Sequence, residues 1–421
     1  RDDLVHERAR ALVNQIVAKD WEGAIASFDD RMRLALPREK LAATWDNVTK
    51  NAGAFLRIDG VEVKPRGDAH VVLVKATFER APLLLRIAID ARGQVAGLFV
   101  SPGDAAGSWQ PPPYADANAF EEKAVTVGTT PGLPGTWTTP KGAKNYPAVV
   151  LVHGSGPNDQ DETIGALKVF KDLAYGLASH GVAVLRYEKR TRVDPAGVRT
   201  QKEEVEDGAH AAIALVASQP DVDKKRVVLV GHSQGGYLAP RIARSDPAIK
   251  GIVLLAGSTR PLEDSLVAQL RYLASAQPGD GVADAIADAE RFRKDVQSPT
   301  LKPEDNVSLP SALGGASIPG AYFLDVRGYR PEKVAAQLTI PVLVLQGERD
   351  YQVTMTEDFA AWKAALGKRT NATWKTYPAL NHAFTAGTGP CLPAEYMKPS
   401  HVDEKVIADV ADWVTRLAAA R

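Results

Sequence analysis

The sequence predicts an α/β fold with a mostly parallel sheet covered by helices on both faces, preceded by a small α+β domain. From about Phe120 onwards, short strands that are apolar throughout alternate with helical segments. Strands without polar alternation are expected in a parallel sheet whose two faces are both buried. A Pro- and Gly-rich stretch at residues 101–119 separates this pattern from a different one before it, and such a stretch is typical of an extended linker.

Residues 1–100 are predicted to form the small domain. Leu4, Leu12 and Ile16 follow the spacing of one helix face, and a second short helix is predicted over residues 21–29. Strand-like stretches separated by turns follow at residues 54–63, 69–78, 83–90 and 94–99. Helices followed by a run of neighbouring strands predict an α+β unit with an antiparallel sheet.

Residues 120–421 are predicted to form the larger domain. Its strands are expected at residues 149–152, 182–186, 227–230, 252–256, 342–345 and 373–377. Its helices are expected at residues 168–180, 203–219, 237–244 and 402–419. Segment 258–337 interrupts the alternation and reads as mostly helical, with a loose stretch at 308–320. An insertion after a strand often covers the site of such a fold, so we predict a lid.

The composition excludes several classes of protein. Among 421 residues there are 51 Lys and Arg and 51 Asp and Glu, so the formal net charge is zero. A chain without excess positive charge is not expected to bind nucleic acid or an anionic membrane. The apolar runs have strand length, far below the ~20 residues that span a bilayer, so no membrane span is predicted. The single cysteine, Cys391, cannot form an intrachain disulfide or a multi-cysteine metal site.

The sequence fits more than one cellular compartment. The chain begins at Arg1 without a Met, as expected of a processed product. A cytoplasmic protein and a protein secreted after removal of a signal peptide both fit this composition.

A candidate nucleophile stands directly after an apolar strand. The sequence reads GHSQGG at residues 231–236 and continues into a predicted helix. A serine between glycines at this place is typical of a sharp, strained turn that holds the hydroxyl clear of the sheet. Gly231, Gly235 and Gly236 leave room for the turn, and the helix N-terminus behind it favours developing negative charge. The sequence therefore predicts Ser233 as the nucleophile.

A serine nucleophile needs a base, and the base needs a group that orients it. In folds of this class the chain order is serine, then acid, then histidine. Asp350 and His382 each lie just past a predicted strand, at the sheet edge where catalytic groups gather. We therefore predict Asp350 as the acid and His382 as the base. The competing candidates are Glu348 and Asp358 for the acid and His401 for the base.

A glycine-rich loop supplies a candidate oxyanion hole. An apolar strand continues into HGSGP at residues 153–157, and such a loop can turn a backbone N–H towards a reacting carbonyl oxygen. The predicted donors are the backbone N–H groups of Ser155 and Gln234. The supporting residues of the loop are Gly154, Gly156 and His153, which is expected to act by hydrogen bonding. The spacing of histidines and carboxylates matches no metal motif, so neither a metal nor a cofactor is predicted.

These motifs resemble those of a bacterial group of α/β-hydrolase esterases. The resemblance runs from about Phe120 to the C-terminus. It is carried by HGSGPNDQDETIG at 153–165, RYEKRT at 186–191, GHSQGG at 231–236, and by residues 346–353, 381–384 and 395–407. At Glu188 the group more often has Asp. The resemblance implies Ser233, His382 and Asp350 as the triad, and a small carboxylic ester with a short acyl chain as substrate.

The small domain resembles a domain of uncharacterised function that often precedes such hydrolases. Residues 45–56 and 87–99 carry this likeness. It implies that the domain either forms a homodimer or covers the mouth of the active site.

Three functions are compatible with these residues. The first is a serine carboxylesterase that works through an acyl-enzyme intermediate. The second keeps the same triad but cleaves thioesters or peptides. The third is a binding protein with an incidental hydrolase fold, since a fold does not guarantee a function. The order of the three triad residues along the chain argues against this last function.

A basic cluster follows the strand at 182–186. Its members are Arg186, Lys189, Arg190 and Arg192. They are interpreted either as a contact for an acidic group of the substrate or as an ion-pair network with Asp159, Asp161 or Glu162. The network is favoured, because surface charges are usually solvated or paired.

Overall fold

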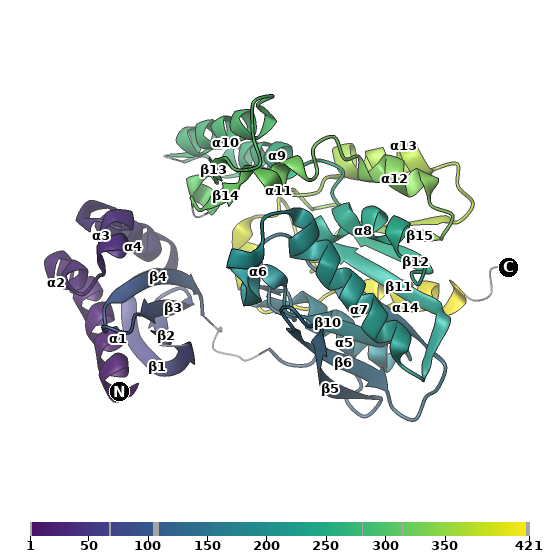
Figure 1. Ribbon diagram of the computed structural model, residues 1–421, viewed down its shortest axis with the longest axis horizontal. Helices are drawn as coiled ribbons and strands as arrows, with labels where there is room; N and C mark the ends of the chain where they lie inside the picture. The colour runs from purple at the N-terminus through teal and green to yellow at the C-terminus, as the bar shows by residue number, and fades with distance from the viewer. Residues whose placement is uncertain (1, 67–68, 104–108, 280, 314, 418–421) are drawn as a thin grey trace. The chain divides into compact units, whose positions relative to one another are not determined.

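The computed structural model describes residues 2–66, 69–103, 109–279, 281–313 and 315–417 (Figure 1). The chain forms two compact units. One contains the described residues up to Gln110, and the other contains those from Pro111 to Glu395 and from Ser400 onwards. The linker predicted at 101–119 includes residues 104–108, which lie outside the described part of the chain.

The first unit packs four helices against one antiparallel sheet. The helices are α1 (Asp2–Val17), α2 (Trp21–Ala26), α3 (Asp30–Ala35) and α4 (Arg38–Ala52). The strands are β1 (Phe55–Arg66), β2 (Ala69–Phe78), β3 (Pro82–Ile89) and β4 (Val95–Pro102), in that order across the sheet. The predicted strand order is therefore present. Helices α3 and α4 were not predicted, although Leu41, Trp45 and Ala52 of α4 repeat at helical spacing and are buried in the core.

The second unit is built on an eight-stranded sheet. Its strands are β5 (Phe120–Val127), β6 (Leu133–Pro140), β7 (Tyr146–Val152), β10 (Ala183–Tyr187), β11 (Val222–His232), β12 (Gly251–Leu255), β15 (Val342–Gly347) and β16 (Ala372–Tyr377). They lie in the order β16-β15-β12-β11-β7-β10-β6-β5. The six strands from β16 to β10 are parallel, while β6 and β5 are antiparallel additions at one edge. The fold class predicted from the sequence is confirmed.

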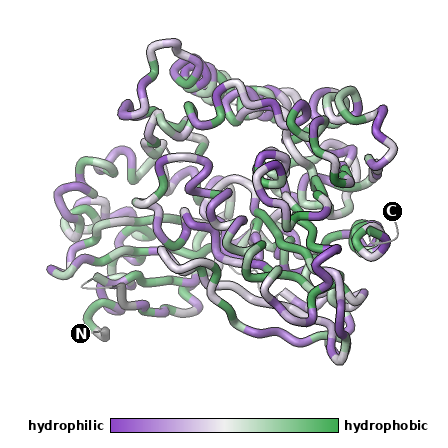
Figure 2. The backbone as a smooth tube through the Cα atoms, turned by 45° about the vertical axis from the view of Figure 1, so that its right-hand side comes forward, coloured by the Kyte–Doolittle hydropathy of each residue, from purple (hydrophilic) through white to green (hydrophobic). Residues whose placement is uncertain are grey.

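Helices cover both faces of this sheet. Helices α7 (Asp207–Ser218), α8 (Gln234–Ser245), α12 (Pro331–Gln337) and α13 (Ala360–Leu366) share one apolar core with alternate residues of the strands. On the other face, α5 (Val169–Ser179) packs against α14 (Glu404–Arg416). Strand β7 is buried over its whole length, and Figure 2 shows hydrophobic segments through the middle of this unit. A strand buried on both faces has no polar alternation, which is the signal that predicted it.

The segment at 258–337 carries the predicted mostly helical insertion. It contains α9 (Leu262–Ala276), α10 (Val282–Gln297), β13 (Asn306–Ser308), β14 (Ser317–Pro319) and α11 (Gly320–Leu324) before α12. The loose stretch predicted at 308–320 is in part a two-stranded hairpin, β13 with β14. Phe292 and Phe323 are buried in a small core of the insertion itself. We call residues 258–337 the lid segment.

Short elements complete the described part of the chain. They are β8 (Thr163–Ile164), β9 (Leu167–Lys168), α6 (Arg190–Val193), the 3-10 turns η1 (Pro195–Gly197), η3 (Ser311–Leu313) and η5 (Pro393–Met397), and the π-helical turns η2 (Lys202–Glu206) and η4 (Met355–Phe359). In the described residues, every helix is too short or too polar to cross a lipid bilayer.

Candidate active site

Ser233 lies in the sharp turn between β11 and α8. Its backbone has φ 52° and ψ −111°, a conformation that L-residues rarely adopt. The positions around it must be glycine, because there is no room for a Cβ atom. A Cβ on Gly235 would lie 2.1 Å from the carbonyl oxygen of Val152, and one on Gly231 would lie 2.3 Å from the carbonyl oxygen of Gly235. Strain of this kind gathers at functional sites, where the surrounding structure enforces it.

Asp350 and His382 meet at the carboxyl edge of the sheet. Asp350 follows β15, and His382 follows the neighbouring strand β16. His382 Nδ1 lies 2.7 Å from Asp350 Oδ2, and both side chains are buried. The second carboxylate oxygen accepts hydrogen bonds from the backbone N–H groups of Gln352 and Val353, at 2.8 Å and 3.0 Å. These bonds fix the carboxylate so that it orients the imidazole ring.

The competing candidates lie elsewhere. Glu348 is exposed. Asp358 is fully buried in η4, where Arg260 and Thr259 surround its carboxylate. His401 pairs with Asp172 of α5, with Nδ1 3.1 Å from Oδ1, at the start of the C-terminal helix. The structure therefore brings together the predicted Asp350 and His382 and none of their competitors.

The glycine-rich loop lies directly against the nucleophile. A Cβ on Gly154 would be 3.2 Å from the Cβ of Ser233. The side chain of Asn158 donates hydrogen bonds to the carbonyl oxygens of Gly154 and Ser155, at 2.9 Å and 3.1 Å. Gly156 has φ +97°, the left-handed region that favours glycine. The loop is therefore held in a fixed position close to Ser233.

His153 stabilises this loop from inside the protein. Its Nε2 donates to the carbonyl oxygen of Asp159 at 3.1 Å, and its ring packs between Phe170 and Tyr187. Burial lowers the pKa of His153 to about 4, so the ring is neutral near pH 7. The described residues contain no group of three metal-ligating side chains that would hold an ion.

A buried His–Glu pair beside the nucleophile was not predicted. His232 Nδ1 lies 2.9 Å from Glu162 Oε2, and His232 Nε2 lies 3.0 Å from the carbonyl oxygen of His382. The other oxygen of Glu162 accepts the N–H of Gly154 at 2.6 Å. Burial on its own lowers the pKa of His232, but the charge and hydrogen bond of Glu162 raise it overall. Since both ring nitrogens face acceptors, the imidazolium form satisfies the site.

The basic cluster forms ion pairs. Arg186 binds Glu122 and Asp161, at 2.8 Å and 3.0 Å. Arg190 pairs with Asp194, and Arg192 with Glu188. The partner predicted as Asp161 is correct, whereas Glu162 binds His232 instead and Asp159 bonds to Thr163. The network interpretation therefore describes this cluster.

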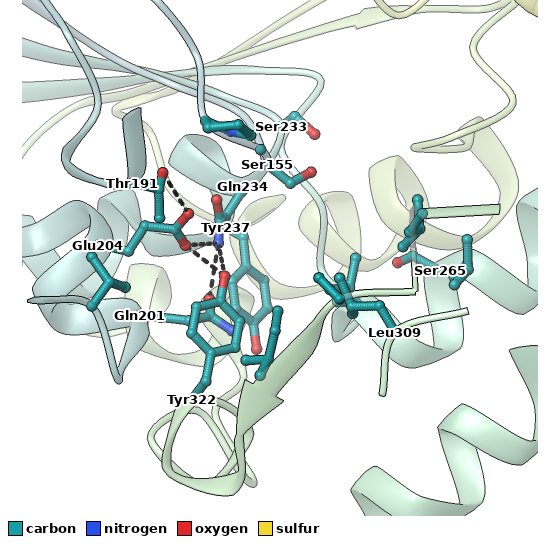
Figure 3. Close-up of a pocket in the computed structure, with 18 of the residues that line it drawn as sticks. Ser155, Thr191, Gln201, Glu204, Ser233, Gln234, Tyr237, Ser265, Leu309 and Tyr322 are labelled. Carbon is teal, nitrogen blue, oxygen red and sulfur yellow. Dashed lines mark hydrogen bonds between the residues drawn. The ribbon is translucent and has the colours of Figure 1, made fainter. Parts of the chain in front are cut away.

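Lys189 is the exception within the cluster, because it points into the protein. Its side chain is 2% exposed, and its Nζ lies 3.1 Å from Glu204 Oε1. Glu204 Oε2 accepts hydrogen bonds from Tyr322 of the lid segment, at 2.5 Å, and from the side chain of Gln234, at 3.1 Å. Burial and the nearby carboxylate raise the pKa of Tyr322 well above 10, so the hydroxyl stays protonated. Figure 3 shows the hydrogen bonds among Glu204, Gln234 and Tyr322 along one wall of a cavity.

That cavity has a volume of about 740 Å³. Ser233 and Ser155 lie side by side on its wall, and the lid segment provides another part of it (Figure 3). The lid residues that line it include Leu262, Leu266, Leu309, Ile318 and Tyr322. Apolar walls with a few convergent polar groups are typical of a site for a small organic molecule.

Comparison with known proteins gives matches along most of the chain. A model of the alpha/beta hydrolase family matches residues 149–387, and a model described as a protein of unknown function (DUF3887) matches residues 9–98. Esterase EstD from Thermotoga maritima is 37% identical over 413 residues, which make up 97% of this chain and 95% of that relative.

Two solved structures illustrate the more distant similarity. Est1E from Butyrivibrio proteoclasticus is 17% identical, with 70% of this chain and 99% of that chain covered, at a TM-score of 0.45. A hyperthermophilic esterase from the archaeon Pyrobaculum calidifontis is 18% identical, with 71% and 87% covered, at a TM-score of 0.47.

The family follows from the hydrolase model and the Thermotoga relative. The hydrolase model spans more than half of the chain, and the Thermotoga relative aligns with almost all of it. The resemblance drawn from the motifs is therefore confirmed, including the extra domain in front. The chain belongs to the alpha/beta hydrolase family and is a hydrolase enzyme.

Proposed function

We propose that the protein is a serine carboxylesterase with Ser233, His382 and Asp350 as its catalytic triad. The observation that carries the proposal is the 2.7 Å contact between His382 Nδ1 and Asp350 Oδ2, at the sheet edge where the strained Ser233 lies. Esterase EstD, with which the chain shares 37% identity, supports the esterase activity.

The reaction has two steps. Ser233 Oγ attacks the acyl carbon while His382 takes the hydroxyl proton, and the alcohol leaves with that proton, so that an acyl-enzyme remains. A water molecule then attacks the acyl carbon as His382 takes its proton. The carboxylic acid is released and Ser233 regains its hydrogen. Throughout, the Asp350 carboxylate holds the ring and stabilises the imidazolium that forms.

The negative oxygen of each tetrahedral intermediate is bound by backbone amides. We assign this role to the N–H groups of Ser155 and Gln234, the first in the glycine-rich loop and the second at the start of α8. Both residues line the cavity together with Ser233. Removing one such donor in other hydrolases costs about 10²- to 10³-fold in kcat.

For the substrate we propose a small carboxylic ester with a short acyl chain. The short chain rests on the resemblance to short-chain esterases. The cavity of about 740 Å³ has to hold the alcohol part as well, and it falls in the range of sites for drug-sized molecules. The lid segment contributes much of the wall and is expected to set the preference.

The first experiment compares the wild type with Ser233→Ala on p-nitrophenyl esters from acetate to laurate. We expect turnover by the wild type that falls beyond butyrate or hexanoate, and loss of turnover in the variant at an unchanged circular dichroism spectrum. The matched control is Ser245→Ala at the other end of α8, where the hydroxyl donates to the carbonyl oxygen of Ile242. Esterase activity retained in Ser233→Ala would overturn the triad.

Assays of the same purified protein distinguish the alternative classes of substrate. A thioesterase would prefer an acyl-CoA over the matched oxygen ester in kcat/KM, and a peptidase would cleave aminoacyl arylamides. We expect the oxygen ester to be preferred over both. A binding protein would turn over none of the three.

A further inference from the structure

We propose that Lys189 is a positioning residue for the oxyanion hole, because it binds the peptide that carries one of the two amides and the side chain of the residue that carries the other. The inference rests on the proposed function, because that function assigns the two amides to Ser155 and Gln234. The ammonium group of Lys189 contacts the peptide that carries the first N–H and the side chain of the residue that carries the second.

The first contact acts through a single peptide group. Lys189 Nζ donates to the carbonyl oxygen of Gly154 at 2.7 Å. That carbonyl and the N–H of Ser155 belong to the same planar peptide, in which they point in opposite directions. A fixed donor on the oxygen therefore fixes the direction of the N–H. Asn158 Nδ2 donates to the same oxygen at 2.9 Å, so both lone pairs are engaged.

The charge of Lys189 adds to this geometric effect. A cation at the carbonyl oxygen polarises the peptide and makes its N–H a stronger donor, as in a chain of hydrogen bonds. The surroundings are dry, because Lys189 and Glu204 are 2% and 5% exposed. Screening by water is weak at such a place.

The second contact fixes the residue next to the nucleophile. Lys189 Nζ donates to Gln234 Oε1 at 2.8 Å. Gln234 Nε2 in turn donates to Glu204 at 3.1 Å and to the hydroxyl of Tyr322 at 2.9 Å. The side-chain amide of Gln234 is thus held from both ends, at the residue whose backbone N–H is the second proposed donor.

The three protons of the ammonium group match three acceptors: Gly154 O, Gln234 Oε1 and Glu204 Oε1. Buried ion pairs often contribute little to stability, since desolvation offsets their attraction. A fully satisfied buried lysine that binds the peptide of one proposed donor and the side chain of the other is better explained by the reaction than by folding.

The test measures turnover per active site in Lys189→Met. With p-nitrophenyl butyrate and active sites counted by burst titration, we expect kcat to fall about 10- to 100-fold, while KM changes less than about threefold because ground-state binding is kept. Affinity for phenylboronic acid, whose tetrahedral adduct places an oxygen in the hole, should fall in parallel with kcat/KM. A second variant, Lys189→Met/Glu204→Gln, leaves no unpaired buried carboxylate and replaces the single variant if that one does not fold.

Arg186→Met is the matched control. Arg186 lies on the same stretch of chain, is 3% exposed and also binds two carboxylates. Its partners are Glu122, Asp161 and Thr138, none of which is a proposed oxyanion donor. We expect this variant to lose stability and keep its kcat per active site. The proposal is overturned if the Lys189 variants keep wild-type kcat, or if Arg186→Met lowers kcat and boronic acid affinity equally. Activity in Ser233→Ala would instead overturn the triad, so the two failures are distinguishable.

Discussion

At the residue scale, two side chains of opposite charge bind the backbone of one glycine, Gly154. The N–H of Gly154 binds Glu162, and its carbonyl oxygen binds Lys189. Glu162 also binds His232, whose other ring nitrogen binds the backbone of His382. Lys189 also binds Glu204, which accepts a hydrogen bond from Tyr322. The loop beside the nucleophile is therefore connected both to the proposed base and to the lid segment.

The neutral buried ring of His153 gives a pH dependence of stability. Its pKa is about 4 in the folded protein and about 6.5 in the unfolded chain, so the unfolded state binds more protons between these values. The free energy of unfolding is therefore expected to fall as pH falls from 6.5 to 4. His153→Gln keeps a donor but cannot titrate. By urea denaturation at both pH values, the wild type should lose roughly 3 kcal/mol more than the variant. Equal losses would contradict the prediction.

The residues of the proposed triad could be predicted because each has a local signal. Ser233 lies in a glycine-rich turn, Asp350 follows an apolar strand, and His382 follows a strand-like stretch, the later β16. The buried pairs have no such signal. Glu162 lies 70 residues before His232, and Glu204 lies 118 residues before Tyr322. In the sequence these carboxylates look like surface charges, and the fold alone brings them to their partners.

At the element scale, the lid segment has a core of its own. Phe292 of α10 is buried against Phe323, with ring centroids 5.5 Å apart. Tyr272 of α9 stacks on Tyr351, the residue after Asp350, with centroids 4.9 Å apart. Helices α9, α10 and α11 of the lid segment therefore share a core that is separate from that of the sheet, to which α12 belongs. We expect these three helices to loosen without unfolding the sheet.

Phe292→Ala tests this independence. Loss of a buried ring costs about 3–5 kcal/mol, and we expect the loss to appear as faster amide hydrogen exchange in α9 and α10, with β11 and α8 unchanged. Arg291→Ala, next to it but half exposed, is the control and should change exchange little. Faster exchange throughout the central sheet after Phe292→Ala would show that the lid segment and the sheet unfold together.

The strands that were predicted and those that were missed differ in how apolar their sequences are. Strands such as β7 and β12 are apolar along their length and could be recognised from the sequence. Strands β5 and β6 were missed, because β5 exposes most of its residues at the sheet edge, and β6 is mostly buried but contains Gly, Pro and Thr instead of an apolar run. The helix expected at 203–219 begins with a π-helical turn, which periodicity at 3.6 residues does not reveal.

At the scale of the whole molecule, two cores are separate. The first unit buries residues such as Phe28 and Trp45 around its own sheet, and the second buries its central strands. Since each unit has a core of its own, we expect each to fold alone. We propose that the first unit forms a homodimer, because it exposes large apolar side chains such as Leu34 and Phe99, which are 85% and 67% exposed.

Sedimentation velocity of the full chain and of residues 111–421 tests this proposal. We expect a dimer for the full chain and a monomer for the fragment, so that the sedimentation coefficient falls by more than the lost mass explains. Circular dichroism of the fragment checks that it is folded. If both species have the same assembly state, the first unit has a different role.

The place of the lid segment in the chain has an evolutionary consequence. It lies between β12 and β15, yet these strands are direct neighbours, with Ile252 paired to Val342. An insertion at this point can change in length or sequence while the sheet keeps its register. Descendants can therefore inherit the bond-breaking machinery intact and acquire a new substrate range by exchanging a single module.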